Sequence, residues 1–222
     1  LLSGTSGEPG EGFWSVDLEG CVSVQQHYIR NTPILVSRHA DGLGNAIEVI
    51  DFCPRVQRLD RVYRPTAFAR IIRPVAGVPR ICVRLRPTYE FGARAAQRTF
   101  GSNHIRYVLD RASYRLTTDA PVSFIGEELT FRVERTLHFF LGPDEPFASE
   151  LGTSLSQMLS DTTAEWQIWA RGLATPPEAF TRLPDRLQEL ALASQRLQAR
   201  IIHLDELFYG EAARAPAVAA PA

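Results

Sequence analysis

Alternation of apolar and polar residues with a period of two is the feature that most constrains how this chain can fold. It recurs from Phe13 to Leu141 in short segments rich in Val, Ile, Tyr and Phe, which clusters of Gly, Pro, Asn and Asp separate. This is the pattern of half-buried strands joined by turns. Parallel strands need helical crossovers, and no helical period occurs within this stretch. We therefore predict a mainly β fold, an antiparallel β-sandwich of two packed sheets.

The alternation also places individual strands. From Arg80 to Arg86, the apolar residues Ile81, Val83 and Leu85 are expected to face a core, and the arginines between them to face largely water. We expect other strands over residues 22–30, 34–40, 46–52, 104–110 and 114–117, and one long strand over 129–141.

After residue 146 the apolar period changes to steps of four and three, which predicts amphipathic helices. The first run consists of Leu151, Leu155, Met158, Thr162, Trp166, Trp169 and Leu173. The second consists of Leu183, Leu187, Leu190, Ser194, Leu197, Ile201, Leu204 and Phe208. We therefore divide the chain into a β-sandwich domain (1–147), a linker helix (148–177), an amphipathic helix (178–210) and a disordered Ala/Pro-rich tail (211–222).

Composition narrows the class of protein and of partner. Hydrophobic residues make up 45% and charged residues 22% of the 222-residue chain, as in ordinary globular proteins. A formal net charge of −1 gives no general attraction to nucleic acid or to anionic membranes. No apolar run approaches the roughly 18 residues of a membrane span, and residues 1–30 lack the order of a signal peptide. We expect a soluble protein without a membrane partner.

Cysteine usage bears on the compartment. Cys21, Cys53 and Cys82 match no zinc or thioredoxin-type spacing, and their odd number favours free thiols, which we expect to be buried, over disulfides. Free thiols indicate a reducing compartment, so we expect a cytoplasmic protein. Because the chain opens on Leu1 rather than on methionine, we also expect it to be a fragment of a longer one.

No motif assembles a complete catalytic, cofactor or metal site. No Gly-x-Ser-x-Gly turn presents a serine, and Gly42-x-Gly44 lacks the third glycine of a phosphate-binding loop. Zinc spacing is absent among the histidines, which are His27, His39, His104, His138 and His203. We therefore predict no catalytic, cofactor-binding or metal-binding residue.

Glycoside hydrolysis needs two carboxylates that face one another across the sugar. The carboxylates in or beside predicted strands are Glu48, Asp51, Glu127, Glu128 and Glu134. Nothing in their spacing pairs them. We expect Glu48 and Glu134 on the solvent faces of strands and Glu127-Glu128 in a turn.

Arginine provides the clearest asymmetry of charge. All 24 basic residues are arginine, and twelve of them lie from Arg55 to Arg106 against two acidic residues, Asp60 and Glu90. Such a run can bind nucleic acid or a phosphosugar. No aromatic stacking motif accompanies it, and the acidic C-terminal part can neutralise it, so we do not expect nucleic acid as the partner.

Five stretches form an ordered series. They are Glu48-Val49-Ile50-Asp51-Phe52-Cys53-Pro54, Ala69-Arg70-Ile71-Ile72-Arg73 followed by Gly77, Arg86-Pro87-Thr88-Tyr89-Glu90-Phe91-Gly92, Gly126-Glu127-Glu128, and Thr163-Ala164-Glu165-Trp166-Gln167-Ile168-Trp169. In order and spacing they resemble the N-terminal region of glycoside hydrolase family 15 proteins, the bacterial glucoamylase and trehalase-like enzymes. The likeness spans roughly residues 10–177.

This resemblance implies a supersandwich-like β-sandwich that packs against a following (α/α)6 barrel, with the linker helix between them. In that family the barrel holds both catalytic glutamates, and the enzymes are inverting hydrolases of α-glucosidic bonds such as those of trehalose, maltose or dextrins. The chain has no counterpart of the barrel segments, and it departs from the family after Glu178. The resemblance thus implies a domain that is inactive alone.

Three hypotheses follow. In the first, the chain is the non-catalytic β-sandwich module that scaffolds such a barrel. In the second, it is a stand-alone binding or interaction module that uses the arginine-rich face or the C-terminal amphipathic helix. That helix could pack on apolar surface left by the missing barrel, or self-associate through Leu187, Leu190, Leu197, Ile201 and Leu204. In the third, carboxylates of this chain hydrolyse sugars, which the lack of an evident pair disfavours.

Overall fold

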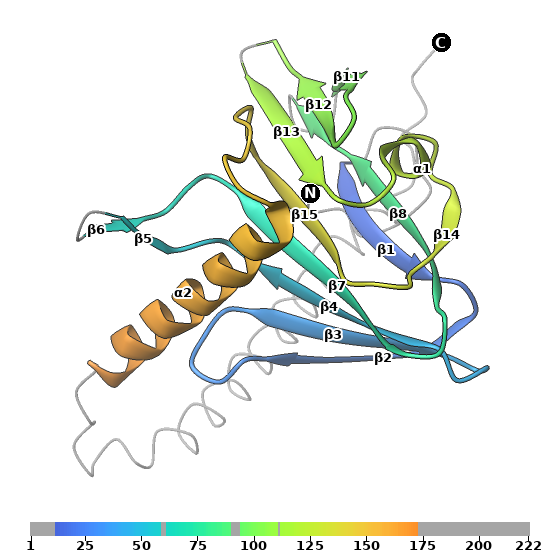
Figure 1. Cartoon of the computed structure of the whole chain (residues 1–222), viewed down its shortest axis with the longest axis horizontal. Coiled ribbons are helices and arrows are strands. Elements are labelled where there is room, and N and C mark those ends of the chain that lie inside the picture. Colours follow the sequence, from blue (N-terminus) through green and yellow to red (C-terminus); the bar gives the residue numbers. More distant parts are fainter. Residues whose placement is uncertain (1–11, 59–60, 90–93, 111, 173–222) are drawn as a thin grey trace, which may run out of the picture. The chain divides into compact units, whose positions relative to one another are not determined.

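The computed structural model describes residues 12–58, 61–89, 94–110 and 112–172 (Figure 1). Within them the helices are α1 (Val122–Gly126) and α2 (Leu151–Arg171). The strands are β1 (Phe13–Leu18), β2 (Cys21–Tyr28), β3 (Leu35–Asp41), β4 (Ala46–Phe52), β5 (Val56–Arg58), β6 (Arg61–Tyr63), β7 (Phe68–Ala76), β8 (Arg80–Arg86), β9 (Thr88–Tyr89), β10 (Arg94–Ala95), β11 (Gln97–Phe100), β12 (His104–Val108), β13 (Ser113–Thr118), β14 (Thr130–Arg132) and β15 (Leu137–Pro143). The prediction of a mainly β chain is confirmed.

Two antiparallel sheets form the body of the fold. The large sheet has eight strands in the order β11-β12-β13-β15-β7-β4-β3-β2, and the small sheet has three in the order β1-β8-β14. Short ribbons pair β9 with β10 and β5 with β6. The small sheet packs on one face of the large sheet and α2 packs on the other, so the predicted antiparallel β-sandwich is confirmed, with a helix added as a further layer.

β7, at the centre of the large sheet, has a nearly continuous apolar sequence because both of its faces are buried. Successive side chains of a strand point to opposite faces. Ile72 therefore joins the apolar cluster under the small sheet, while Ile71 joins the cluster under α2. Neither is more than 1% exposed. A strand buried on both faces loses the period-two signal, and the sequence pattern accordingly placed no strand there.

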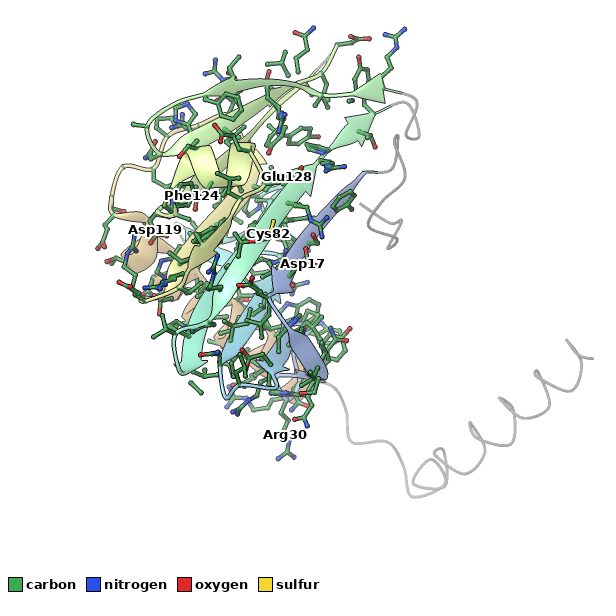
Figure 2. All side chains as sticks on the ribbon, turned by 90° about the vertical axis from the view of Figure 1, so that its right-hand side faces the viewer. Asp17, Arg30, Cys82, Asp119, Phe124 and Glu128 are labelled. Carbon is green, nitrogen blue, oxygen red and sulfur yellow. The ribbon has the colours of Figure 1, made fainter. Side chains whose placement is uncertain are left out.

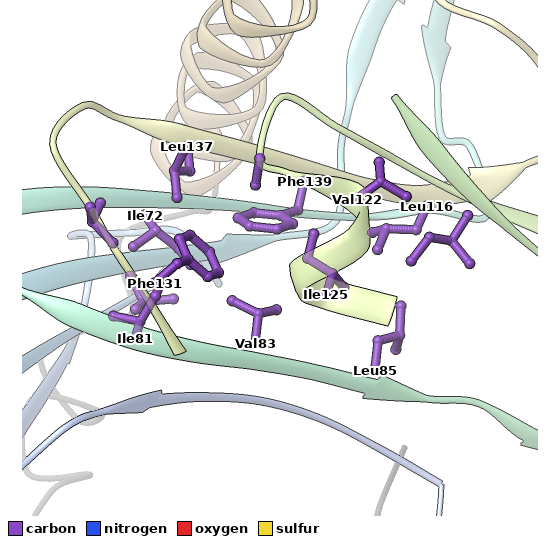
Figure 3. Close-up of a cluster of buried hydrophobic side chains, with 14 of the residues drawn as sticks. Ile72, Ile81, Val83, Leu85, Leu116, Val122, Ile125, Phe131, Leu137 and Phe139 are labelled. Carbon is purple, nitrogen blue, oxygen red and sulfur yellow. The ribbon is translucent and has the colours of Figure 1, made fainter. Parts of the chain in front are cut away.

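The core between the sheets follows the alternation predicted for residues 80–86. Ile81, Val83 and Leu85 of β8 point toward the large sheet and are at most 2% exposed (Figure 3). Phe139 of β15 and Ile125 of α1 pack against them in the same cluster. Burying such a side chain contributes about 1.5 to 3 kcal/mol to folding, so this layer is a main source of stability.

Most predicted strands are found with ends shifted by one or two residues. Those over 46–52 and 80–86 coincide with β4 and β8. Those over 22–30, 34–40, 104–110 and 114–117 correspond to β2, β3, β12 and β13.

The single long strand predicted over residues 129–141 is wrong. The segment forms β14, which pairs with β8 in the small sheet, and β15, which pairs with β7 and β13 in the large sheet. Residues 133–136 carry the chain from one sheet to the other. Val133 stays buried during this crossing, so the apolar alternation continues through a break in the hydrogen-bond ladder.

The first predicted helix is confirmed as α2. Leu155 and Thr162 are fully buried against the body of the fold, and Met158 is partly buried beside the apolar cluster under the helix. The exposed Ile168 and Trp169 lie in its last turn. The second predicted helix (178–210) and the tail (211–222) lie outside the described residues.

Candidate functional site

The structure distributes the five candidate carboxylates over different surfaces. Glu48 and Asp51 both lie on β4 but three residues apart, so their side chains point to opposite faces of the large sheet. Glu127 and Glu128 follow α1, in the turn that the sequence predicted, and the exposed Glu134 lies in the crossing between β14 and β15 rather than on a strand.

Three of these carboxylates bind arginines. Asp51 accepts two hydrogen bonds from Arg70, with Nε–Oδ1 2.6 Å and Nη2–Oδ2 2.9 Å. Glu128 accepts two from Arg86, with Nε–Oε1 2.7 Å and Nη2–Oε2 2.5 Å. Glu48 lies 3.9 Å from Arg73. The hydrogen bonds from Arg86 hold the pKa of Glu128 below its ordinary value, despite the opposing effect of burial. Glu128 is therefore poorly suited to be a general acid, whose pKa must be raised.

Arg70 and Asp51 sit on the face of the large sheet that meets β1. The Arg70 guanidinium lies 4.5 Å from the ring centroid of Trp14 and 3.5 Å from the Trp14 carbonyl oxygen. His39 lies nearby, and its pKa is lowered by burial and by the charge of Arg70, against the smaller opposite effects of Asp17 and Asp51. The ion pair lies within the large sheet, its arginine contacts Trp14 of the small sheet, and the Asp51 carboxylate is not free to act on a substrate.

A pocket of about 710 Å³ brings Glu134 together with Asp119, a residue that the sequence reasoning did not consider. Asp119 begins the loop between β13 and α1 and faces β15. Its Oδ1 accepts the backbone N–H of His138 at 2.8 Å, and its Oδ2 lies 2.7 Å from His138 Nδ1 and 3.2 Å from Arg135 Nη1. Figure 2 labels Asp119 among the side chains of this side of the molecule.

The charge state of Asp119 decides what this pocket can do. Burial acts to raise its pKa, but the hydrogen bonds from His138 and the charges of His138 and Arg135 outweigh it, so the pKa lies below the ordinary value. An inverting hydrolase needs one carboxylic acid with a raised pKa and one free carboxylate. Asp119 fits neither role, because it is ionised and its oxygens are already engaged.

A second pocket, of about 460 Å³, lies between the β11–β12 turn and α1. A Cβ at Gly126 would come within 2.5 Å of Phe100 Cε1, so a larger residue there would displace the exposed Phe100 ring. Among the described residues that line it, Glu127 is the only carboxylate. The pocket therefore lacks the second carboxylate that glycoside hydrolysis needs.

Within the residues that the structure describes, the remaining histidines and the cysteines do not gather into a metal site. His104 Nδ1 accepts a hydrogen bond from Arg115 Nη2 at 3.0 Å, and His27 is exposed on β2. No group of three or more His, Cys, Asp or Glu side chains converges as metal ligands would within the described part of the chain. His203 lies outside that part.

The cysteines are free, as predicted, but the expectation that they are buried is wrong for two of them. Cys21 and Cys53 are exposed, and Cys82 is half-buried on the outer face of the small sheet (Figure 2). The Cys82 thiol donates to the Glu128 carbonyl oxygen at 3.1 Å, and burial raises its pKa. Cys21 lies at an edge strand and Cys53 just after β4, where neither pattern nor spacing revealed exposure.

The arginine run from Arg55 to Arg106 does not form one basic face. Counting only ion pairs between described residues, seven of the twelve arginines lie within 4 Å of a carboxylate, and these are Arg70, Arg73, Arg80, Arg84, Arg86, Arg94 and Arg106. Their carboxylates come from distant parts of the sequence, such as Asp17, Glu19, Glu128 and Asp144. The local excess of positive charge in the sequence is therefore largely compensated in the fold.

The end of α2 presents a different kind of surface, formed by aromatic and aliphatic groups. Thr162 fixes the helix to the segment before β5, because its Oγ1 accepts the Arg55 N–H at 2.8 Å and donates to the Arg55 carbonyl at 3.3 Å. The Arg55 guanidinium lies 3.5 Å from the Trp166 ring centroid, and Trp166 meets Trp169 edge to face at 5.5 Å. Trp169 is 56% and Ile168 57% exposed. We call Trp166, Ile168 and Trp169 the apolar end of α2.

Comparisons were made with protein-family models, with curated proteins and with solved structures. None of them matches this chain. Neither described helix combines the length and the apolar composition that crossing a bilayer requires.

Proposed function

We propose that this chain is the non-catalytic N-terminal β-sandwich module of a glucoamylase/trehalase-like α-glucoside hydrolase, and that it scaffolds an (α/α)6 catalytic barrel. The observation that carries the proposal is the apolar end of α2. The resemblance makes this helix the link between sandwich and barrel. Leu155 fixes this helix to the large sheet and Thr162 fixes it to the segment before β5, while Trp169 and Ile168 are exposed to water at a cost in free energy. A covering partner would remove that cost.

The carboxylates support a scaffolding role over catalysis by the chain itself. Asp51, Glu128 and Asp119 are each bound by arginine or histidine, and the pKa values of Glu128 and Asp119 are lowered rather than raised. Free thiols in a protein with three cysteines are consistent with the cytoplasm, which we propose as its location.

The first experiment measures glucose release from trehalose and from maltotetraose by the purified chain at high concentration. We expect none. Release that is lost in Glu134→Gln or Asp119→Asn would place a catalytic site in the 710 Å³ pocket and contradict the proposal.

The second experiment tests the scaffold directly. A family 15 barrel expressed without its own β-sandwich is mixed with this chain, and its sedimentation and its activity on the two sugars are followed. We expect association and a gain in activity, both weakened by Trp169→Asp. Ser160→Asp, at another exposed position of α2, serves as the matched control and should change neither.

A further inference from the structure

β2 forms one edge of the large sheet and is unusually open. Among the described residues it pairs with β3 on one side and with no strand on the other. All eight of its residues, Cys21–Tyr28, are exposed. The outward N–H and C=O groups of such a strand form a template on which another strand can pair.

The usual protections of an edge strand are missing from β2. Natural edges carry charged residues, proline, or bulges that twist them away. Residues 21–28 include no Asp, Glu, Lys, Arg or Pro, and the bulge at Cys21/Ser23 affects only the first end. The opposite edge of the large sheet, β11, is four residues long and carries Arg98. Of the two edges, β2 is therefore the one better suited to pair with a further strand.

The side chains of β2 are apolar or neutral on the face that it shares with β1 and the small sheet. The regular pairing with β3 starts at Ser23, and from there Val24, Gln26 and Tyr28 lie on one face, opposite His39, Ser37 and Leu35. Val24 is 51% and Tyr28 65% exposed. Gln26 Nε2 donates to Ser37 Oγ at 2.9 Å, which fixes the centre of this row.

We propose that β2 pairs antiparallel with β2 of a second copy of this chain, about a two-fold axis that passes near Gln26. A two-fold axis perpendicular to the sheet leaves each face of the sheet on its own side. Residues directly opposite one another must therefore point to the same face, so their numbers are both even or both odd. With Gln26 opposite its own copy, Val24 faces Tyr28 of the other chain twice, and Gln25 faces His27 twice. The large sheets of the two copies become one continuous sheet.

A second copy of this chain is the partner that we propose for this edge, because the side chains of β2 complement one another across the two-fold axis. Aromatic and β-branched residues directly opposite one another stabilise antiparallel pairs, and like charges opposite one another destabilise them. This register gives two Val–Tyr pairs and places no like charges opposite one another. A single strand pair buries less surface than a standard interface, so we expect a dissociation constant on the order of 10–100 µM.

The test is sedimentation of the full chain over a concentration series, together with cross-linking. We expect a monomer–dimer equilibrium, and Val24→Lys should raise the dissociation constant at least about tenfold, because it removes both Val–Tyr pairs and places charge on the edge. In a background in which Cys21, Cys53 and Cys82 are serine, Gln26→Cys should cross-link two chains through a short bismaleimide. Leu43→Cys, 90% exposed in the β3–β4 turn, is the control that should not.

Three results would overturn the proposal. One is a chain that stays monomeric at about ten times the expected dissociation constant. Another is a dimer that survives Val24→Lys but is lost in Leu190→Asp/Leu197→Asp, which would assign association to the second amphipathic run. The last is a dimer in which Gln26→Cys cross-links no better than Leu43→Cys.

Discussion

Arg70 on β7 and Asp51 on β4 face each other directly across neighbouring strands and form a bidentate salt bridge, with Nε–Oδ1 2.6 Å and Nη2–Oδ2 2.9 Å. Their side chains are only 11% and 15% exposed, and Trp14 covers the guanidinium from β1. The pair is thus placed where the two sheets meet. Each charge is tolerated there because the other is present.

Removing one partner should therefore cost more than removing both. Asp51→Ala leaves the Arg70 charge buried and unpaired, and we expect a loss of about 3 to 5 kcal/mol in the free energy of unfolding. Asp51→Leu combined with Arg70→Met should recover most of that loss. Urea unfolding of the single and double variants measures the coupling. Additive effects of the two substitutions would contradict the buried pair.

Glu128 combines an ion pair with an uncommon backbone conformation. Its φ is +57°, in the left-handed region where glycine is favoured, and its carboxylate binds Arg86. Glu128→Gln and Glu128→Gly both lose the charge, but only glycine relieves the backbone. We expect the glycine variant to be more stable than the glutamine variant by about 1 kcal/mol, as thermal unfolding would show. The reverse order would mean that the glutamine side chain keeps a strong bond to Arg86.

Much of the fold could be predicted because only one face of β8, the face toward the large sheet, is covered. Ile81, Val83 and Leu85 alternate with polar residues, and the pattern therefore reports the strand directly. β7 could not be found in this way, since both of its faces are covered and Ala69 to Ile72 are all buried. The crossing at Val133 was missed for a related reason. The alternation of buried side chains continues through it, while the hydrogen-bonded neighbour changes from β8 to β7.

The candidate site depended on long-range contacts that spacing cannot reveal. Asp51 was one of five carboxylates without a pair in the sequence, and its partner Arg70 belonged to an arginine run that looked like a basic surface. Asp119 carried no local signal at all, since its importance comes from His138, which lies nineteen residues later on the neighbouring strand β15. Trp166 and Trp169 were expected to follow one helical stripe, but the sheet covers only the first part of α2.

The attachment of α2 can be tested by comparing a buried and an exposed apolar residue on the same helix. Leu155 is fully buried against the large sheet, so Leu155→Ala should lower the free energy of unfolding by about 2 to 5 kcal/mol. Ile168→Ala, at a position that is 57% exposed, should change it by less than about 0.5 kcal/mol. Chemical denaturation gives both values. Equal effects would show that the chain beyond α2 covers Ile168 in solution.

Asp119 makes the free energy of unfolding depend on pH in the acidic range. Its pKa in the folded protein is below the ordinary value because bonds from His138 and the charge of Arg135 outweigh burial. A carboxyl whose folded pKa is lowered contributes stability that is fully present above its unfolded pKa, which is about 3.9, and that is lost as the pH falls through the folded value. Asp119→Asn removes this contribution. We therefore expect a loss of about 1 to 2 kcal/mol near pH 7.

The dependence on pH separates this electrostatic effect from a general disturbance of the loop before α1. The difference in unfolding free energy between the native chain and Asp119→Asn should shrink as the pH is lowered from 5 toward 2, because the native carboxyl then becomes protonated as well. Urea unfolding at several pH values measures it. A difference that stays constant over this range would mean that the substitution acts by disturbing the packing around His138, rather than through the charge that the structure places between Arg135 and His138.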